Sequence, residues 1–152
     1  MNGPFPNSAP ALLQGECRVG TCLGRGGMSQ VWAATTGTGT PVAVKVSNPA
    51  VVDPVAARAL IQREYAFLSA LSHRNIVSVL GLTEIDHTDA GKGPGIVMEY
   101  VSGGDLASLA GSRPGHWLPV AAQLAGALVY LHAAGFVHRD IKARNVLLRS
   151  GD

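Results

Sequence analysis

Short hydrophobic runs separated by glycine-rich segments mark the first third of the chain. The runs CRVGTCL and QVWAATT lie on either side of the glycine-dense residues 24–27, and a third run, PVAVKV, follows TTGTGT. β-Branched and aromatic runs of this length, bounded by glycine, are typical of strands joined by tight turns. The pattern predicts three strands over residues 17–46, with a glycine turn between the first two.

A helical pattern comes next. Asp53 followed by Pro54 is a helix start signal, because an Asp side chain caps the first backbone amides and Pro suits the first helical position. Apolar residues then recur at offsets of three and four, which predicts a helix over residues 54–71. Glu64 falls on the same face as the apolar Ile61. A carboxylate on an apolar stripe needs a cationic partner, and a solvated Glu64 at the edge of the stripe is the simpler alternative.

The middle of the chain predicts two further strands. IVSVLGLTEI at residues 76–85 and GIVMEYV at 95–101 have the composition of strands, whereas residues 86–95 show no hydrophobic period and predict a loop.

Helices are expected in the last third of the chain. Asp105 can cap a short helix in DLASLAG, and HWLPVAAQLAGALVYLHAAG predicts a helix over residues 118–134 that stops at Gly135. A run of strands followed by helices indicates an α+β fold.

Composition narrows the class of protein. The chain has 152 residues, 47% of them hydrophobic, which suffices for a single domain with its own core. Charged residues make up 14% and the formal net charge is +2, so we expect neither nucleic acid nor a membrane surface as the main partner. No apolar run reaches the roughly 18 residues that span a bilayer, and MNGPFPNSAP does not resemble a signal peptide. We expect a flexible leader over residues 1–15 and a cytoplasmic protein.

The two cysteines lie close together in sequence. Cys17 and Cys22 are five residues apart in one predicted strand, where an odd separation places side chains on opposite faces. We therefore expect them to stay unpaired and to act as small buried hydrophobic residues rather than as metal or redox groups.

The glycine turn and Lys45 are candidates for phosphate binding. Glycines allow the backbone to approach phosphate oxygens and to direct amides at them without a Cβ in the way. Lys45 stands alone among the apolar residues of VAVKV, and an ammonium in a buried strand needs an anionic partner. Glu64 is the natural candidate. A plain tight hairpin and an exposed edge lysine are the alternatives.

The stretch VHRDIKARNVLL, at residues 137–148, is the strongest candidate for a catalytic site. It places Asp140, Lys142 and Asn145 at short offsets in a polar segment between apolar runs. A rigid scaffold often presents catalytic groups on such a loop. We expect the three side chains to converge on one small volume.

These motifs together resemble those of eukaryotic-type serine/threonine protein kinases, including the bacterial ones. HRDIKARN resembles the HRDxKxxN catalytic loop, and LGRGGMSQV followed by VAVK resembles the glycine-rich loop and third strand. SHRNIV and MEYVSGG resemble the entry to the fourth strand and the linker between the two lobes. Ser29 departs from the pattern, because it stands where the family's third glycine usually lies.

The resemblance implies a protein kinase-like fold in which a small antiparallel sheet lobe with one helix precedes a helical lobe. We expect the first lobe over residues 16–98, a hinge over 99–104, and a partial second lobe over 105–152. The helix glutamate Glu64 would pair with Lys45.

The resemblance also implies cofactors, which are ATP and Mg²⁺. Asp140 would orient the substrate hydroxyl and accept its proton, Lys142 would steady the γ-phosphate, and Asn145 would bind one Mg²⁺. The residues expected around the nucleotide are Leu23, Gly24, Arg25, Gly26, Gly27, Met28, Ser29, Gln30, Val31, Ala43, Lys45, Glu64, Met98, Glu99, Val101 and Leu147.

The expected substrate is a protein with a serine or threonine acceptor. Lys142 favours this class, whereas tyrosine kinases usually carry AAR at that place, a pattern that Ala143 and Arg144 partly echo. The family's DFG and APE motifs do not occur before Asp152. We therefore expect a fragment of a longer kinase, with little activity as this chain and with apolar helical surface through which it could associate. Two alternatives stay open: a non-catalytic form that binds nucleotide or a partner protein, and a small-molecule phosphotransferase with a kinase-like fold.

Overall fold

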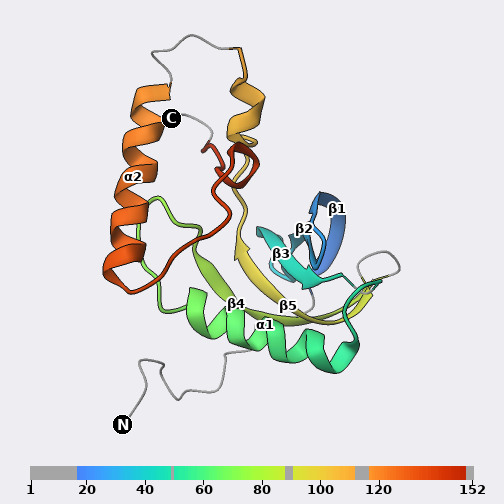
Figure 1. Cartoon of the computed structure of the whole chain (residues 1–152). Coiled ribbons are helices and arrows are strands. Elements are labelled where there is room, and N and C mark those ends of the chain that lie inside the picture. Colours follow the sequence, from blue (N-terminus) through green and yellow to red (C-terminus); the bar gives the residue numbers. More distant parts are fainter. Residues whose placement is uncertain (1–16, 49, 88–90, 112–116, 150–152) are drawn as a thin grey trace. The chain divides into compact units, whose positions relative to one another are not determined.

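The computed structural model describes residues 17–48, 50–87, 91–111 and 117–149. The chain folds into two compact units (Figure 1). Within the described residues, the first unit comprises 17–72 and 78–100, and the second comprises 73–77 and 101–149. The leader expected over residues 1–15 lies outside the described residues.

The first unit is built on an antiparallel sheet of five strands in the order β1-β2-β3-β5-β4. Its three N-terminal strands and the glycine turn between the first two are as predicted. The strands are β1 (Arg18–Arg25), β2 (Ser29–Thr35), β3 (Pro41–Ser47), β4 (Val79–His87) and β5 (Gly91–Glu99).

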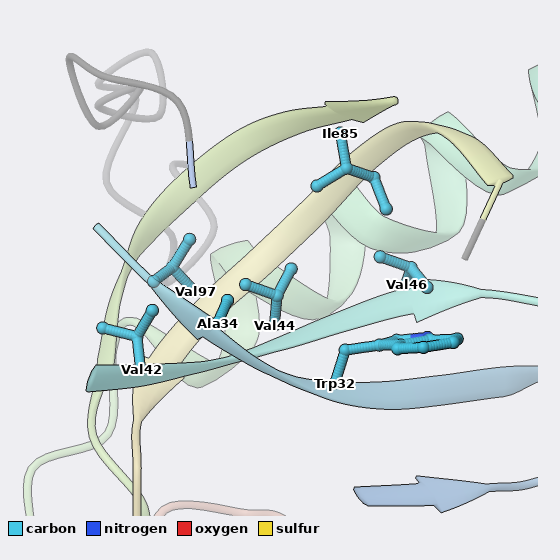
Figure 2. Packing of buried hydrophobic residues seen from close by; sticks show 7 residues of the cluster. All are labelled: Trp32, Ala34, Val42, Val44, Val46, Ile85 and Val97. Carbon is cyan, nitrogen blue, oxygen red and sulfur yellow. The ribbon is translucent and has the colours of Figure 1, made fainter. Parts of the chain in front are cut away.

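Apolar side chains of the strands themselves cover one face of this sheet. Figure 2 shows the cluster, in which the ring of Trp32 and the side chains of alternate β3 residues lie against residues of β4 and β5. Val44 and Val97 are fully buried. The cluster consists of Trp32, Ala34, Val42, Val44, Val46, Ile85 and Val97.

The other face of the sheet carries the helix α1 (Pro54–Leu68), which lies across β4 and β5 (Figure 1). The helix begins as predicted, because the Asp53 carboxylate accepts from the amides of Val55 and Ala56 and Pro54 occupies the first position. Ile61 is its buried residue and packs with Leu82 of β4 and Ile96 of β5.

The end of α1 differs slightly from the prediction. The helix ends at Leu68 rather than at Leu71, and turn hydrogen bonds continue from there to Leu71.

The prediction of a loop over residues 86–95 is wrong. Asp86 and His87 extend β4, and β5 starts at Gly91, so most of this segment forms a long hairpin with residues 88–90 outside the described part. These strands were not predicted because the segment has no hydrophobic period. A β-ladder is formed by hydrogen bonds between backbone groups, and these do not depend on such a period. Lys92 and Asp86, which are paired across the two strands, form an ion pair at 3.0 Å.

The strand predicted over residues 76–85 also starts too early. β4 begins at Val79, and residues 73–77 belong to the second unit instead. There the ring centroids of His73 and Tyr130 lie 5.2 Å apart, and the Asn75 amide donates to the Gln123 side chain at 2.7 Å.

The prediction that Cys17 and Cys22 point to opposite faces is wrong. Both are half-buried free cysteines that pack, together with Val19, against the Trp32 cluster. The reason is local. β1 shifts its register against β2 between Val19 and Cys22, and such an irregularity breaks the strict alternation of side chains.

The second unit contains the short 3₁₀-helix η1 (Leu106–Leu109), the helix α2 (Trp117–Ala133) and the 3₁₀-turn η3 (Ala143–Asn145). Asp105 caps η1 through the amide of Ser108, as predicted. α2 is also confirmed, and Gly135 follows its end at a φ of 81°, a conformation that favours glycine. Neither α-helix in the described part of the chain is long and apolar enough to cross a membrane.

Residues after the polar loop return to the start of the second unit. The amide of Gly103 donates to Leu148 O, and the amide of Leu148 donates to Gly104 O, both at 2.9 Å. The amide of Leu106 donates to Val146 O at 2.8 Å. This pairing anchors the segment that follows Asn145.

Candidate active site

Lys45 and Glu64 form the first candidate cluster, as the sequence predicted. The Lys45 Nζ lies 2.5 Å from Glu64 Oε1, although the two residues belong to different elements, β3 and α1. Both side chains keep about a quarter to a third of their surface exposed, at 26% and 33%. The positive charge of Lys45 is therefore balanced by a carboxylate, and part of its side chain stays open to solvent.

Further predicted site residues share the sheet face of Lys45. Val31 and Ile96 are the cross-strand partners of Lys45, and Met98 is the partner of Ala43. Directly opposed residues in an antiparallel sheet lie on the same face. The apolar side chains of Val31, Ala43 and Met98 thus line the face on which Lys45 presents its charge.

The glycine turn is open and tied to the end of β3. The amide of Gly26 donates to Ser29 O at 2.8 Å, which closes the turn. The amide of Asn48 donates to Met28 O at 2.9 Å. A Cβ built on Gly24 or Gly27 would meet no atom within 4 Å, so space for a ligand lies beside their backbone. Leu23 and Met28 at this turn are exposed.

Two of the residues predicted around the nucleotide point their side chains elsewhere. The Arg25 guanidinium lies over the Trp32 ring, 5.5 Å from its centroid, and Trp32 Nε1 donates to the buried Gln30 side chain at 3.1 Å. Trp32 is on the opposite face from its neighbour Val31. Arg25 and Gln30 could therefore serve a ligand on the Lys45 face only through their backbone.

At the end of β5, the Glu99 carboxylate already has a partner. It accepts from the amide of Ser78 at 2.9 Å, and the Glu99 amide donates to Ser78 O at 3.0 Å. A contact from Glu99 to a nucleotide would thus have to come from its carbonyl oxygen. Val101 follows as a half-buried residue of the second unit.

The second candidate cluster lies in the second unit and brings together the three polar residues that the sequence singled out. Lys142 Nζ lies 2.9 Å from Asp140 Oδ2, and Asn145 Nδ2 donates to the same oxygen at 2.9 Å and to the Asp140 backbone oxygen at 2.8 Å. The convergence predicted from spacing is confirmed. The described bonds converge on Oδ2, which leaves Oδ1 as the oxygen that could receive a substrate hydroxyl.

The surroundings of Asp140 favour its charged form. Hydrogen bonds from Lys142 and then from Asn145 lower the pKa of Asp140 below its ordinary value. His138, which the sequence analysis passed over, accepts from the Asp140 amide through Nδ1 at 3.4 Å. Arg139 between them has a φ of 64°, in the left-handed region. His138 and Arg139 thus determine the local backbone conformation next to the Asp140 carboxylate.

Asn145 fits the role of a metal ligand through one atom. Its amide nitrogen donates both described hydrogen bonds, so its Oδ1 is the atom that could bind Mg²⁺, a cation that prefers oxygen. Among the described residues no group of three or more His, Cys, Asp or Glu side chains could hold a metal. Mg²⁺ usually takes few protein ligands and completes its shell with phosphates and water, so these residues fit a metal that arrives with a nucleotide.

A family model described as the protein kinase domain matches residues 17–152. The chain belongs to the protein kinase family. This confirms the fold class expected from the resemblance. The segment that holds Asp140, Lys142 and Asn145 lies within the matched residues. Leu147 follows it as an exposed residue bridged to Asp105.

Known protein kinases align with most of the chain. A probable serine/threonine-protein kinase of Streptomyces coelicolor is 40% identical over 144 residues, covering 91% of this chain and 21% of that protein. CBL-interacting protein kinase 4 of Oryza sativa subsp. japonica is 40% identical over 144 residues, covering 90% and 31%. Serine/threonine-protein kinase pkn2 of Myxococcus xanthus is 33% identical over 141 residues, covering 90% and 16%. The chain thus spans less than a third of the length of these three relatives.

Proposed function

We propose that this chain carries the nucleotide-binding and catalytic-loop parts of a serine/threonine protein kinase. The reaction is transfer of the γ-phosphoryl group of ATP to serine or threonine hydroxyls of a protein. The observation that carries the proposal is the Asp140 cluster, in which a carboxylate, a cation and a metal-type amide oxygen lie together in one exposed loop. A protein catalyses phosphoryl transfer mainly by positioning the phosphate and the acceptor hydroxyl and by offsetting charge, and these residue types can do both.

The first unit binds the nucleotide in this proposal. Lys45 contacts phosphate oxygens, and Glu64 holds the ammonium in place. The glycine turn offers backbone amides beside open space. Val31, Ala43 and Met98 form the apolar surface for adenine, with the backbone of Glu99 as a further contact. ATP supplies the phosphoryl group, and Mg²⁺ offsets charge on its oxygens.

The second unit carries the groups for transfer. Asp140 orients the acceptor hydroxyl and takes its proton, Lys142 contacts the γ-phosphate, and Asn145 ligates one Mg²⁺. An efficient general base has a pKa near the working pH, whereas hydrogen bonds lower that of Asp140. Asp140 is therefore an orienting carboxylate first, and it takes the proton when Lys142 turns from it to the transferred phosphate.

The Streptomyces and Myxococcus relatives are named as serine/threonine-protein kinases, which supports serine and threonine as acceptors. The presence of Lys142 two residues after Asp140 supports the same class. A cytoplasmic location stays a prediction from the sequence.

Binding of Mg-ATP to this chain, measured by isothermal titration calorimetry, tests the first part of the proposal. Lys45→Met removes a charged hydrogen bond to phosphate, so affinity should fall about 10- to 100-fold. Lys92→Met is the matched control, because Lys92 is also an ion-paired lysine of the sheet but lies 81% exposed beside Asp86. Equal affinities of the Lys45→Met and wild-type chains would refute the assignment of Lys45.

Phosphoryl transfer from radiolabelled ATP to serine- and threonine-containing peptides tests the second part. Asp140→Asn should lower the rate about 10²- to 10⁴-fold, whereas Asp86→Asn, in an equally exposed Asp–Lys pair, should leave it unchanged. Transfer to sugars or other small hydroxyl compounds but not to peptides would favour a small-molecule phosphotransferase. Failure to bind Mg-ATP at all would favour a partner-binding form.

A further inference from the structure

The helix that carries Glu64 is attached to the sheet unevenly. Ile61 is the buried residue of α1, with 2% of its surface exposed, and apolar packing continues from there through Tyr65 and Leu68. Val55 in the first turn is 81% exposed. The first half of the helix therefore gains little from the hydrophobic effect.

A hollow of about 260 Å³ lies beside the start of α1. Pro54 and Ala57 line it from α1, and Val46, Ile85 and Pro94 line it from β3, β4 and β5. Val46 and Ile85 belong to the Trp32 cluster on the opposite face of the sheet, so this hollow flanks the first turn of α1.

An ion pair spans from this loosely packed half of α1 to the sheet. Arg58 Nη1 lies 2.7 Å from Glu84 Oε1, and Arg58 Nη2 lies 3.3 Å from Glu84 Oε2, so the contact is bidentate. Glu84 is next but one to Leu82 in β4, which puts its side chain on the face that α1 covers. Hydrogen bonding to Glu84 raises the pKa of Arg58, so its guanidinium stays charged at any physiological pH.

The positions of the contacts along α1 relate the Arg58–Glu84 ion pair to Glu64. Arg58 lies three residues before the buried Ile61, and Glu64 lies three residues after it. The apolar contacts of α1 run from Ile61 to Leu68, so the half of the helix before Ile61 is the half that can tilt, and the ion pair at Arg58 restrains this tilt. Breaking the contact at Arg58 should therefore allow the helix to tilt and loosen the Glu64 contact to Lys45.

We propose that Arg58 and Glu84 are positioning residues that hold α1 where Glu64 can pair with Lys45. The proposal rests on the nucleotide-binding function above only for the role of Lys45, since the geometry of the Lys45–Glu64 pair can be followed without nucleotide. Both side chains of the Arg58–Glu84 pair are about half exposed, at 52% and 51%, so the restraint is modest and accessible from solvent.

The test is the rate at which an amine-acylating reagent modifies Lys45, followed by mass spectrometry on the 152-residue chain. A lysine held by a carboxylate is less accessible to the reagent than a free one. Arg58→Gln and Glu84→Gln should each raise the rate at Lys45 about two- to fivefold. The exchanged pair Arg58→Glu with Glu84→Arg should return it close to the wild-type rate. Lys92 and Lys142, which are already exposed, are internal references whose rates should not change.

Two controls separate this role from general effects of charge or unfolding. Asp86→Asn removes a different exposed ion pair of the same sheet and should leave the Lys45 rate unchanged. Glu64→Gln should raise it most, because it removes the partner itself. Wild-type rates in Arg58→Gln and Glu84→Gln beside a raised rate in Glu64→Gln would overturn the proposal, and so would an exchanged pair that fails to restore the rate.

Affinity for Mg-ATP in the same variants distinguishes this proposal from the proposed function. If the wild-type chain binds Mg-ATP, Arg58→Gln should weaken binding about two- to fivefold and the exchanged pair should restore it. If the wild-type chain does not bind, the nucleotide-binding proposal fails, and the modification rate of Lys45 still decides whether Arg58 and Glu84 position Glu64.

Discussion

Replacing Gly103 with alanine should destabilise the second unit. A Cβ built at Gly103 falls far inside van der Waals contact with the Leu148 carbonyl oxygen and lies 2.8 Å from the Leu148 carbonyl carbon. These atoms are backbone, so no side chain can move aside to make room. The segment around Leu148 would have to move away from residues 103–104.

The cost follows from the hydrogen bonds that such a movement breaks. The bonds Gly103 N to Leu148 O and Leu148 N to Gly104 O are both 2.9 Å long and would lengthen together. At about 0.5–1.5 kcal/mol each, their loss amounts to about 1–3 kcal/mol.

Gly126 is a matched control for the same substitution. It lies in the middle of α2 and exposed, and a Cβ there would meet nothing within 4 Å beyond the helix itself. Alanine in place of a helical glycine stabilises by about 0.5–1 kcal/mol. The same chemical change is thus expected to have opposite signs at two positions of one unit.

Urea unfolding followed by circular dichroism measures both free-energy changes, and hydrogen exchange localises them. Gly103→Ala should lower the amide protection of residues 103–109 and 143–149, and Gly126→Ala should raise that of α2. If Gly103→Ala unfolds at the wild-type urea concentration, or if Gly126→Ala destabilises the chain equally, the steric argument is refuted.

Three further predictions concern α1 and Asp140. Ile61→Ala should cost about 2–5 kcal/mol in urea unfolding and Ile61→Val about 0.5–1.5 kcal/mol, because Ile61 is 2% exposed; equal costs would contradict the packing described. Asp53→Ala should cost about 1 kcal/mol and Asp53→Asn much less, because Asn keeps an oxygen acceptor for the Val55 and Ala56 amides; equal melting temperatures would contradict the cap. The lowered pKa of Asp140 means that its carboxylate stabilises the folded state above the unfolded pKa of about 3.9, and this contribution is lost as pH falls through the lower folded pKa. The melting temperature should therefore fall less steeply below about pH 4 in Asp140→Asn than in the wild type, and parallel curves would contradict this.

Local signals in the sequence predicted the elements that depend on local chemistry. Asp53 with Pro54 predicted the start of α1, and Gly135 predicted the stop after α2, because capping and backbone freedom involve only neighbouring residues. The hairpin of β4 and β5 was missed around Gly91 and Gly93. Its ladder is backbone pairing between residues that carry no hydrophobic pattern, and the ion pair of Asp86 with Lys92 appears only once the register is known.

The division into units was harder to predict. Ile76 and Val77 continue the apolar run that leads into β4, yet they belong with the second unit, whose contacts include His73 with Tyr130 and Asn75 with Gln123. An apolar run shows that residues are buried but not against which element. The irregular register of β1 was likewise invisible, since Val19 and Cys22 carry no sign of a bulge.

The ion pairs of this chain show how predictability falls with separation in sequence. Asp140 and Lys142 are two residues apart, so the loop alone brings them together. Lys45 and Glu64 are 19 apart, and their pairing needed the phase of a helix as well as a family resemblance. Arg58 and Glu84 are 26 apart on exposed surface, where any opposite charge could have served, and no motif marked them. Motifs in the sequence therefore predicted the candidate site residues, whereas the contact of Arg58 with Glu84 became visible only in the structure.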